Sequence, residues 1–379
     1  MSVWRWAELI APVDPAARIT LGEGGTPLVR SRRIGPALGI ELSLKLESSN
    51  PTGSYKDRFA AVAVSAMRAR GATRCLATSS GNTGAALAAY CAAAGASCDI
   101  ALVETAPPGK IKQMLAYGAT LARITGFGVD AAISDAVLRM LARDGGGPDA
   151  SLEISAYRFS PIGMTGVETI AFEIAEQDPN AEHVFCPAGG GGLALAVARG
   201  FARLRASGAG PAPRVECVQP AGNDTIASAL RAGRRATAVA CATAISGLQV
   251  PTVIDGDETI AACAASGGTG HVVSDAEVWR AQEALAREEG VFAEPAAATA
   301  LAGAIAARRD GRIAAGARVV CLVTGSAFKD PVSLDRMVAG LACPTVSAAE
   351  WGGRASPGRQ PVRSADQSLR RRAAGRTPR

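Results

Sequence analysis

The chain has few aromatic residues and almost no histidine. Phe, Trp and Tyr make up 4% of the 379 residues, and the two histidines are His183 and His271. None of the nine cysteines forms a Cys-x-x-Cys pair, which argues against a structural zinc site and against a disulfide framework. Most cysteines lie in apolar runs, as Cys75, Cys186 and Cys321 do, so we expect buried free thiols.

The sequence also lacks long hydrophobic runs. It contains no uninterrupted apolar run of about 20 residues, so we expect no membrane helix and no membrane partner. No basic segment followed by an apolar one opens the chain, which argues against a secretory leader. Together with the unpaired cysteines, these features predict a cytoplasmic location.

Positive charge is concentrated at one end of the chain. The segment 344–379 holds eight arginines, no lysine and two acidic residues, which accounts for the whole formal net charge of +6. The rest carries 32 basic and 32 acidic residues, so a nucleic-acid partner is not expected. Because 344–379 is rich in Arg, Ser, Pro and Gly, we expect this tail to be disordered.

Short apolar segments alternate with segments of helical spacing along the rest of the chain. In the first half we expect strands at 41–47, 75–78, 100–103 and 121–124, and helices at 60–70, 85–94, 111–117 and 130–143. After a glycine-rich break at 144–151 we expect strands at 183–186, 214–219 and 318–323, and helices at 165–177, 194–204, 276–289 and 294–307. The alternation predicts an α/β fold with doubly wound parallel sheets.

Four polar loops leave these expected strands. They are 48–58 (SSNPTGSYKDR), 79–84 (SSGNTG), 187–193 (PAGGGGL) and 324–331 (TGSAFKDP). Each loop alone could be an ordinary turn. Ligands of open α/β sheets bind where loops leave the carboxyl ends of the strands, so the four loops together indicate one binding site.

Lys56 is the residue of these loops with the most distinctive chemistry. It lies just before an expected helix and next to Asp57 and Arg58. Most lysines are solvated surface residues, and that interpretation stays open for Lys56. The alternative is an amine that bonds covalently to a cofactor aldehyde, which requires burial or neighbouring cations that lower the pKa of the lysine.

The other loops offer partners for an anionic cofactor. The glycines of 187–193 leave backbone N–H groups accessible at the start of a helix, which suits a phosphate. This run lacks the lysine of a P-loop and the spacing of GxGxxG, so a nucleotide is less expected. The loop 79–84 offers hydroxyl and amide groups for a carboxylate and a phenolic oxygen. With a hydroxyl from Thr324, these features describe a site for pyridoxal 5'-phosphate (PLP).

The motifs resemble those of the threonine synthase family, which is part of the fold-type II PLP enzymes. The resemblance covers about residues 4–331 and follows the family's order through GEGGTPL (22–28), KLESSNPTGSYKDR (45–58), SSGNTGAALAAYCAAAG (79–95), GKIKQMLAYGA (109–119) and TGSAFKDP (324–331). It implies a PLP cofactor between two lobes. The lobes would be a large body of 1–47 and 151–343 and a smaller mobile lobe of 48–150, in a homodimer.

The resemblance also implies a role for each site residue. Lys56 would carry PLP and act as the catalytic base, Asn82 would bond the ring hydroxyl, and Thr324 would face the pyridine nitrogen. The cofactor phosphate would be held by Gly189, Gly190, Gly191 and Gly192. The amino-acid substrate's carboxylate and neighbouring groups would be held by Ser79, Ser80 and Thr83, with Arg158 near its distal group.

Two departures from the family pattern concern the substrate. The family's GNAGN-like phosphate loop is replaced by GGGGL, as in serine/threonine dehydratases and serine racemase. The family's NPYRxEGxKT segment aligns with 160–169 (SPIGMTGVET), which puts Gly163 at the arginine and Glu168 at the lysine, with Arg158 displaced.

Three functions follow from these observations. The first is a threonine synthase that replaces the phosphate of O-phosphohomoserine with water to give L-threonine. The second is a lyase that eliminates or replaces the β-substituent of serine, threonine, O-phosphoserine or a similar amino acid. The third is a non-catalytic PLP-binding protein, against which the intact lysine loop speaks.

Overall fold

The computed structural model describes residues 2–79, 81–104, 106, 108–208, 210, 213–348 and 351. Residues Met1–Ser333 form one compact unit, and Leu334–Arg379 form a second. The boundary lies ten residues before position 343, where we expected the large body to end. Most of the tail that we expected to be disordered lies outside the described residues.

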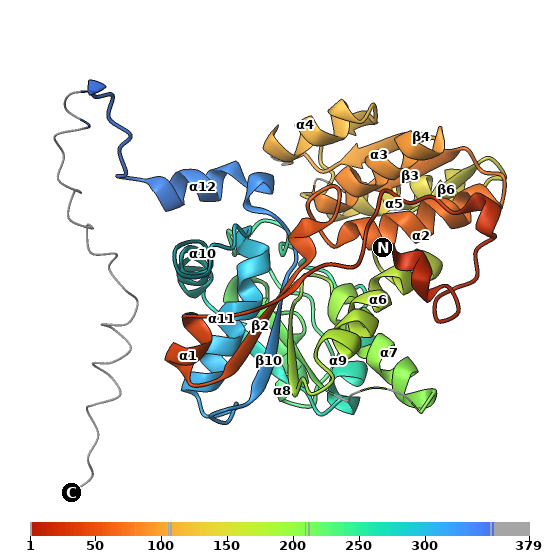
Figure 1. Ribbon diagram of the computed structural model, residues 1–379. Coiled ribbons are helices and arrows are strands. Elements are labelled where there is room, and N and C mark those ends of the chain that lie inside the picture. The colour runs from red at the N-terminus through yellow and green to blue at the C-terminus, as the bar shows by residue number, and fades with distance from the viewer. Residues whose placement is uncertain are drawn as a thin grey trace, which may run out of the picture. The chain divides into compact units, whose positions relative to one another are not determined.

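Six strands form the larger sheet, in the order β1-β2-β10-β7-β8-β9. Strand β1 is antiparallel to β2, and the other neighbours are parallel. Figure 1 shows β2 and β10 side by side, although one lies near the start of the chain and the other near residue 320. The bounds are β1 (Leu28–Arg30), β2 (Glu41–Leu46), β7 (His183–Pro187), β8 (Arg214–Pro220), β9 (Gly270–Val273) and β10 (Arg318–Val323).

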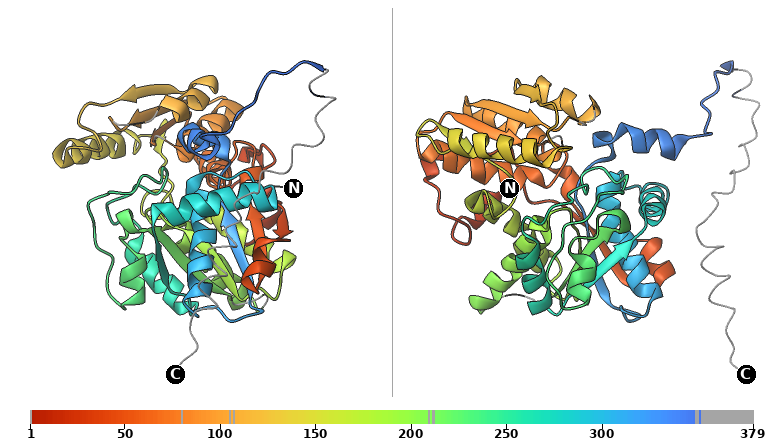
Figure 2. Two further views of the ribbon diagram at one scale, coloured as in Figure 1. Left: turned by 90° about the vertical axis from the view of Figure 1, so that its left-hand side faces the viewer. Right: turned by 180° about the vertical axis from the view of Figure 1, so that it is seen from behind.

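Four parallel strands form the smaller sheet, in the order β5-β4-β3-β6. They are β3 (Arg74–Thr78), β4 (Ser97–Leu102), β5 (Thr120–Arg123) and β6 (Ala150–Leu152). The two views of Figure 2 show the sheets in separate lobes, which confirms the predicted α/β class with two parallel-sheet lobes. Strand β6 carries the smaller sheet to Leu152, two residues beyond the expected lobe boundary at 150.

Helices cover both faces of each sheet. In the larger sheet, Leu44 and Phe185 pack with the residues of α10 and α11, while Val184 and Cys186 on the other face join the core of α6 and α7. No helix of the described residues is long and apolar enough to cross a bilayer. The helices are α1 (Ile34–Leu38), α2 (Lys56–Ala69), α3 (Asn82–Ala94), α4 (Pro108–Ala116), α5 (Ala131–Asp144), α6 (Pro161–Gln177), α7 (Gly192–Ala206), α8 (Ala227–Arg231), α9 (Gly256–Ala265), α10 (Asp275–Glu289), α11 (Pro295–Arg309) and α12 (Pro331–Val338).

Two helices begin earlier than the sequence predicted. Helix α2 starts at Lys56 and not at 60, and α3 starts at Asn82 and not at 85. The first four N–H groups of a helix have no intrahelical partner, so polar loop residues often occupy the first turn. Such residues show no hydrophobic periodicity, and the start of the helix is then hard to recognise in the sequence. Lys56 is therefore the first residue of its helix, and the expectation that it precedes the helix was wrong, because the helix begins four residues before the expected start at 60.

The cysteines are buried as predicted at Cys75, Cys186 and Cys321. The sequence did not show that Cys75 on β3, Cys91 on α3 and Cys98 on β4 meet. Their sulfur atoms all lie within 4.8 Å of one another in the core of the smaller lobe. These thiols fill space between the sheet and α3, as small apolar side chains do.

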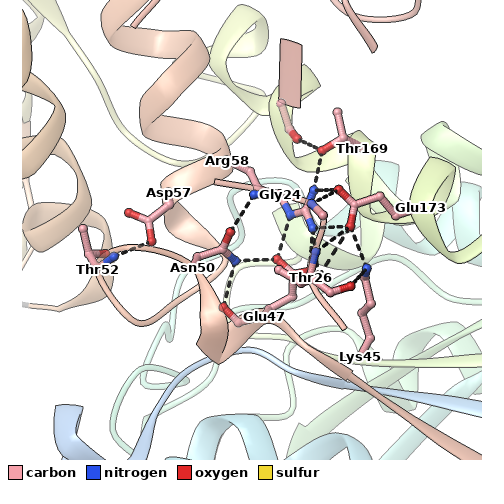
Figure 3. A network of polar contacts seen from close by, with 12 residues as sticks. Gly24, Thr26, Lys45, Glu47, Asn50, Thr52, Asp57, Arg58, Thr169 and Glu173 are labelled. Carbon is pink, nitrogen blue, oxygen red and sulfur yellow. Dashed lines mark hydrogen bonds and ion pairs between the residues drawn. The ribbon is translucent and has the colours of Figure 1, made fainter. Parts of the chain in front are cut away.

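A buried ionic network anchors helix α2 (Figure 3). The Arg58 guanidinium donates to Glu47 Oε2 at 2.7 Å and to Glu173 Oε1 at 2.7 Å, and the Lys45 amine donates to Glu173 Oε2 at 2.6 Å. Burial disfavours the Arg58 charge, but Glu47 and Glu173 outweigh burial and raise the pKa of Arg58. Two cations and two carboxylates thus balance in the core, and they fix Lys56 two residues before Arg58.

Thr26 of the N-terminal glycine segment joins the same network. Its hydroxyl donates to Glu47 Oε1 at 2.6 Å, and its carbonyl accepts from Lys45 Nζ at 2.7 Å. Burial raises the pKa of the Glu173 carboxyl, but the hydrogen bond and charge of Arg58 outweigh burial and lower that pKa to about 2. The network therefore connects residue 26, strand β2, helix α2 and helix α6 through buried hydrogen bonds and ion pairs.

Candidate active site

The lysine loop and the Thr324 loop lie against each other. The Tyr55 amide donates to the Thr324 carbonyl at 3.0 Å, and the Ser326 amide donates to the Gly53 carbonyl at 3.0 Å. The Glu294 amide donates to the Gly325 carbonyl at 3.0 Å. Because these loops follow β2 and β10, neighbours in the larger sheet, the parallel pairing brings Lys56 and Thr324 to the same sheet edge.

Lys56 is half-buried at the start of helix α2. Its amine donates to Ser155 Oγ at 2.8 Å and lies 4.6 Å from the centroid of the Tyr55 ring. Ser155 follows β6 of the smaller sheet and the Lys56 loop follows β2 of the larger sheet, so segments that leave the two sheets meet at the lysine amine. Sequence analysis did not find Ser155, because no motif marks a serine that meets Lys56 from 99 residues away.

Asn82 is the first residue of helix α3, and its amide lies against a buried carboxylate. The Asn82 Nδ2 donates to Glu294 Oε1 at 2.7 Å. Within the described part of the chain, the buried Asn82 Oδ1 has no hydrogen-bond partner. Buried polar atoms are usually paired, so this oxygen indicates room for a ligand group. Sequence analysis missed Glu294, although an acidic residue before the Ala-rich helix α11 was a visible signal.

The glycines of 189–192 form a close-packed turn into helix α7. Gly191 has φ +96°, and a Cβ there would lie 2.3 Å from Thr259 Oγ1. A Cβ at Gly192 would lie 3.1 Å from Asp255 Oδ2. No side chain of the described residues caps this 15-residue helix, so its first N–H groups remain available to an anion. Glycine is therefore required here both by backbone conformation and by space.

Asp255 links this glycine turn to the loop that carries Ser155. Its amide donates to the Gly190 carbonyl at 3.2 Å, and its carboxylate accepts from the amides of Tyr157 at 2.8 Å and Arg158 at 3.1 Å. Burial raises the pKa of Asp255, while these two amide bonds lower it in part. Sequence analysis did not identify this residue, which joins the turn to the partner of Lys56.

The loop expected to hold the substrate carboxylate forms the start of helix α3. Ser79 Oγ accepts from the amides of Gly81 at 3.2 Å and Gly84 at 3.0 Å, so this hydroxyl oxygen caps the helix. Thr83 is half-buried as the second residue of α3. Ser80 lies outside the described residues. The Ser79 O–H group can still donate to a carboxylate while its oxygen caps the helix.

Arg158, which we expected near the distal group of the substrate, does not line the same cavity as Lys56 or Asn82. Its side chain is exposed, with the guanidinium carbon 5.9 Å from the centroid of the Phe159 ring. It lines a cavity of about 700 Å³ whose lining includes Arg70 and Gly163 but neither Lys56 nor Asn82. The structure thus brings Lys56, Asn82, Thr324 and the glycine turn to the ends of the strands, and it does not bring Arg158 to the lysine amine.

Gly163 and Glu168 have structural contacts in helix α6. A Cβ at Gly163 would lie 2.8 Å from Phe59 Cε2 on helix α2, so an arginine side chain has no room there. Glu168 is buried, and it accepts from the Tyr157 hydroxyl at 2.8 Å and from Arg203 Nε at 3.0 Å. Glu168, which aligns with the family's lysine, is thus paired with Arg203 and is not an isolated negative charge.

A family model described as "Pyridoxal-phosphate dependent enzyme" matches residues 19–325. The threonine synthase of Methanocaldococcus jannaschii is 34% identical over 340 residues, covering 87% of this chain and 81% of its own. That of Mycobacterium leprae is 34% identical over 333 residues, covering 84% and 85%. The chain belongs to the pyridoxal-phosphate-dependent enzymes, within their threonine synthase family. It is therefore a PLP-dependent enzyme of fold type II.

Solved structures of this class have the same fold. Isoform 2 of threonine deaminase from Solanum lycopersicum superposes with a TM-score of 0.71 at 23% identity, covering 89% of this chain and 87% of its own. Maize serine racemase gives 0.68 at 24% identity, covering 83% and 92%. The site fits PLP, because the glycine turn leaves a helix N-terminus open for the phosphate and Asn82 presents an unpaired oxygen.

Proposed function

We propose that this enzyme converts O-phosphohomoserine and water to L-threonine and phosphate. The observation that carries the proposal is the 34% identity to threonine synthases over more than four fifths of the chain. Lys56, Asn82 and Thr324, the residues for which the family pattern implies roles, lie at the strand ends that the fold brings together.

In this proposal Lys56 does the proton transfers. The amine would hold the cofactor and, when free, would remove the proton from Cα of the substrate and then move a proton at Cβ. Ser155, at 2.8 Å, orients the amine and accepts its hydrogen bond whenever the amine is free of the cofactor. The network around Arg58 fixes the helix that carries the lysine, so the amine starts each step from one position.

Other residues would hold and orient PLP, which supplies the electron sink for the chemistry. Gly189–Gly192 and the start of α7 would bind its phosphate, and Asn82 would contact the ring hydroxyl. Thr324 would meet the ring nitrogen with a neutral hydroxyl, which does not favour a protonated ring as a carboxylate would. Ser79, Ser80 and Thr83 would take the substrate carboxylate.

A second candidate is a lyase that eliminates or replaces a β-substituent of serine, threonine or O-phosphoserine. The observation in its favour is the placement of Gly163 and Glu168, which supply no cation to the site where the family has arginine and lysine. The GGGGL turn, similar to that of serine/threonine dehydratases, also favours this second candidate. A homodimer, a cytoplasmic location and a mobile lobe of about 48–150 stay predictions.

A panel of substrates distinguishes the two reactions. The holoenzyme is incubated with O-phosphohomoserine, O-phosphoserine, O-acetylserine, serine and threonine, and phosphate, threonine and oxo-acid products are measured. The proposal predicts phosphate and threonine from O-phosphohomoserine as the fastest reaction. Turnover of a Cβ-substituted amino acid with O-phosphohomoserine inert would replace the proposal by the second candidate.

A further inference from the structure

A cavity of about 520 Å³ opens beside Asn82, and its lining is positively charged. The 13 lining residues include Lys112 and Lys329 together with polar groups of Thr52 and Gln113, and none of the 13 is Asp or Glu. Because Asn82 belongs both to this lining and to the proposed cofactor site, the cavity adjoins the reaction centre. Its charge suits an anion.

The two lysines are unusual for this chain. Of its 40 basic residues, 35 are arginines and five are lysines, at positions 45, 56, 110, 112 and 329. Lys45 lies in the buried network, and Lys56 is the proposed catalytic residue. Arginine thus supplies most of the cationic surface. Two of the five lysines, Lys112 and Lys329, line this one cavity.

Lys329 is held in place within this lining. It is 9% exposed, and its amine donates to Gln113 Oε1 at 2.7 Å. Gln113 Nε2 in turn donates to the Thr52 carbonyl at 3.2 Å. A Cβ at Gly53 would lie 3.3 Å from Lys329 Cε, so the glycine allows the lysine stem to pass close to the loop. Lys112, next to Gln113 on helix α4, is exposed and reaches the cavity from solvent.

A buried hydroxyl provides a second, independent indication of a ligand. Thr52 is 4% exposed and lines the cavity, and its Oγ1 has no hydrogen-bond partner among the residues that the structure describes. A buried hydroxyl without a partner costs free energy that a bound acceptor recovers. Asp57 accepts from the Thr52 amide at 2.9 Å and interacts electrostatically with Lys329, so it balances part of the lysine charge from the protein side.

We propose that this cavity binds the phosphate ester of the substrate, with Lys329 and Lys112 as its cations and the Thr52 hydroxyl as a donor. The inference rests on the proposed function, and it explains how the chain offsets the missing cations at Gly163 and Glu168. A phosphate dianion is costly to bury unpaired, so the chain must supply positive charge somewhere near the reacting carbon atoms.

The test uses inorganic phosphate and the PLP-loaded enzyme. Phosphate binding is measured by isothermal titration calorimetry, while the cofactor absorbance shows that the PLP site stays filled. We expect Lys329→Gln to weaken phosphate binding about tenfold or more, since a charge-assisted bond is lost. Lys112→Gln and the nearly isosteric Thr52→Val should each weaken it about threefold to tenfold. Arg287→Gln, on the exposed face of helix α10, is the charge-matched control and should leave binding unchanged.

The same variants are then assayed for turnover of O-phosphohomoserine, where the inference predicts a raised KM with a smaller effect on turnover of serine. Phosphate that fails to bind, or that binds equally to all variants, overturns the inference even if O-phosphohomoserine is converted. Binding that depends on these residues, with O-phosphohomoserine inert and O-phosphoserine converted, supports the cavity and contradicts the proposed function. Thr52→Val keeps the test valid if Lys329→Gln fails to fold.

Discussion

Lys56 and Asp57 are neighbours in sequence but have different surroundings. Lys56 is half-buried at the meeting point of the lobes, whereas Asp57 is fully buried, with one carboxylate oxygen bonded to the Thr52 amide. The other oxygen, Oδ1, has no partner among the described residues. Burial raises the pKa of Asp57 from 3.8 to about 7, despite the opposing bond from Thr52.

The raised pKa of Asp57 predicts that the stability of the folded protein falls as the pH rises through this pKa. The folded state binds the proton more tightly than the unfolded chain, so stability is lost progressively between about pH 4 and pH 8. Asp57→Asn resembles the protonated form. We expect the variant to match the wild type at about pH 3.5, below the pKa of the unfolded chain, and to be more stable at pH 8, by at most about 4 kcal/mol. Denaturant melts at both pH values measure this, and an equal difference at the two pH values would contradict it.

Lys56 should be the lysine that bonds the cofactor. Borohydride reduction of the holoenzyme followed by peptide mapping should label Lys56 among the five lysines of the chain. Lys56→Ala should keep the fold, because its helix is anchored by Arg58, but should lose the lysine-dependent absorbance and all turnover. A label on another lysine, or residual turnover in Lys56→Ala above background, would show that the assignment is wrong.

At the residue scale, the sequence located candidate residues only where a motif is local. Lys56, Asn82 and Thr324 lie in loops whose composition and order are recognisable, and the fold places all three at strand ends. Ser155, Asp255 and Glu294 were missed because the side-chain hydrogen bonds that bring them to the site join residues 97 or more positions apart. Such contacts depend on the packing of two sheets, which no local pattern encodes.

At the scale of elements, the glycine turn before α7 is the most constrained segment of the site. It combines a positive φ at Gly191 with contact to Thr259, and it leaves the N-terminus of the helix open. The sequence correctly indicated that the glycine run 187–193 is a strand-to-helix turn. It placed the start of the helix two residues late, at 194, because glycine gives no helical signal.

Gly191→Ala should therefore impair cofactor binding beyond the cost of its backbone conformation. A residue with Cβ at positive φ costs about 1–2 kcal/mol, and the clash with Thr259 adds to this. Gly208→Ala, at φ +76° beyond the other end of α7 with nothing within 4 Å of its Cβ, is the matched control. We expect PLP affinity to fall at least about tenfold in Gly191→Ala only. Equal PLP affinity in the two variants would contradict this account of the turn.

At the scale of the whole molecule, the buried network around Arg58 connects segments that are distant in sequence. It joins residues 26, 45, 47, 58 and 173, so the N-terminal segment, the larger sheet and the lysine helix share one polar core (Figure 3). The sequence predicted the α/β class and the order of elements. It could not predict this network, because its charges appeared in the sequence as ordinary solvated residues.

Arg58→Met should be strongly destabilising. It leaves Glu47 and Glu173 buried without their main partner, which costs about 3–5 kcal/mol in unfolding free energy. Arg287→Met removes an exposed pair with Glu283, 3.2 Å apart, and should cost about 0.5 kcal/mol or less. Urea unfolding of both variants measures the difference. A loss below about 1 kcal/mol in Arg58→Met would show that the network does not hold the helix in place.

The central claim is that the enzyme breaks the Cγ–O bond of O-phosphohomoserine and adds water at Cβ. The most direct test is turnover in ¹⁸O-labelled water, with mass spectrometry of both products. The account predicts one ¹⁸O atom in the threonine hydroxyl and none in the released phosphate, since the bridging oxygen leaves with phosphorus. Labelled phosphate together with homoserine, or no conversion at all, would contradict it.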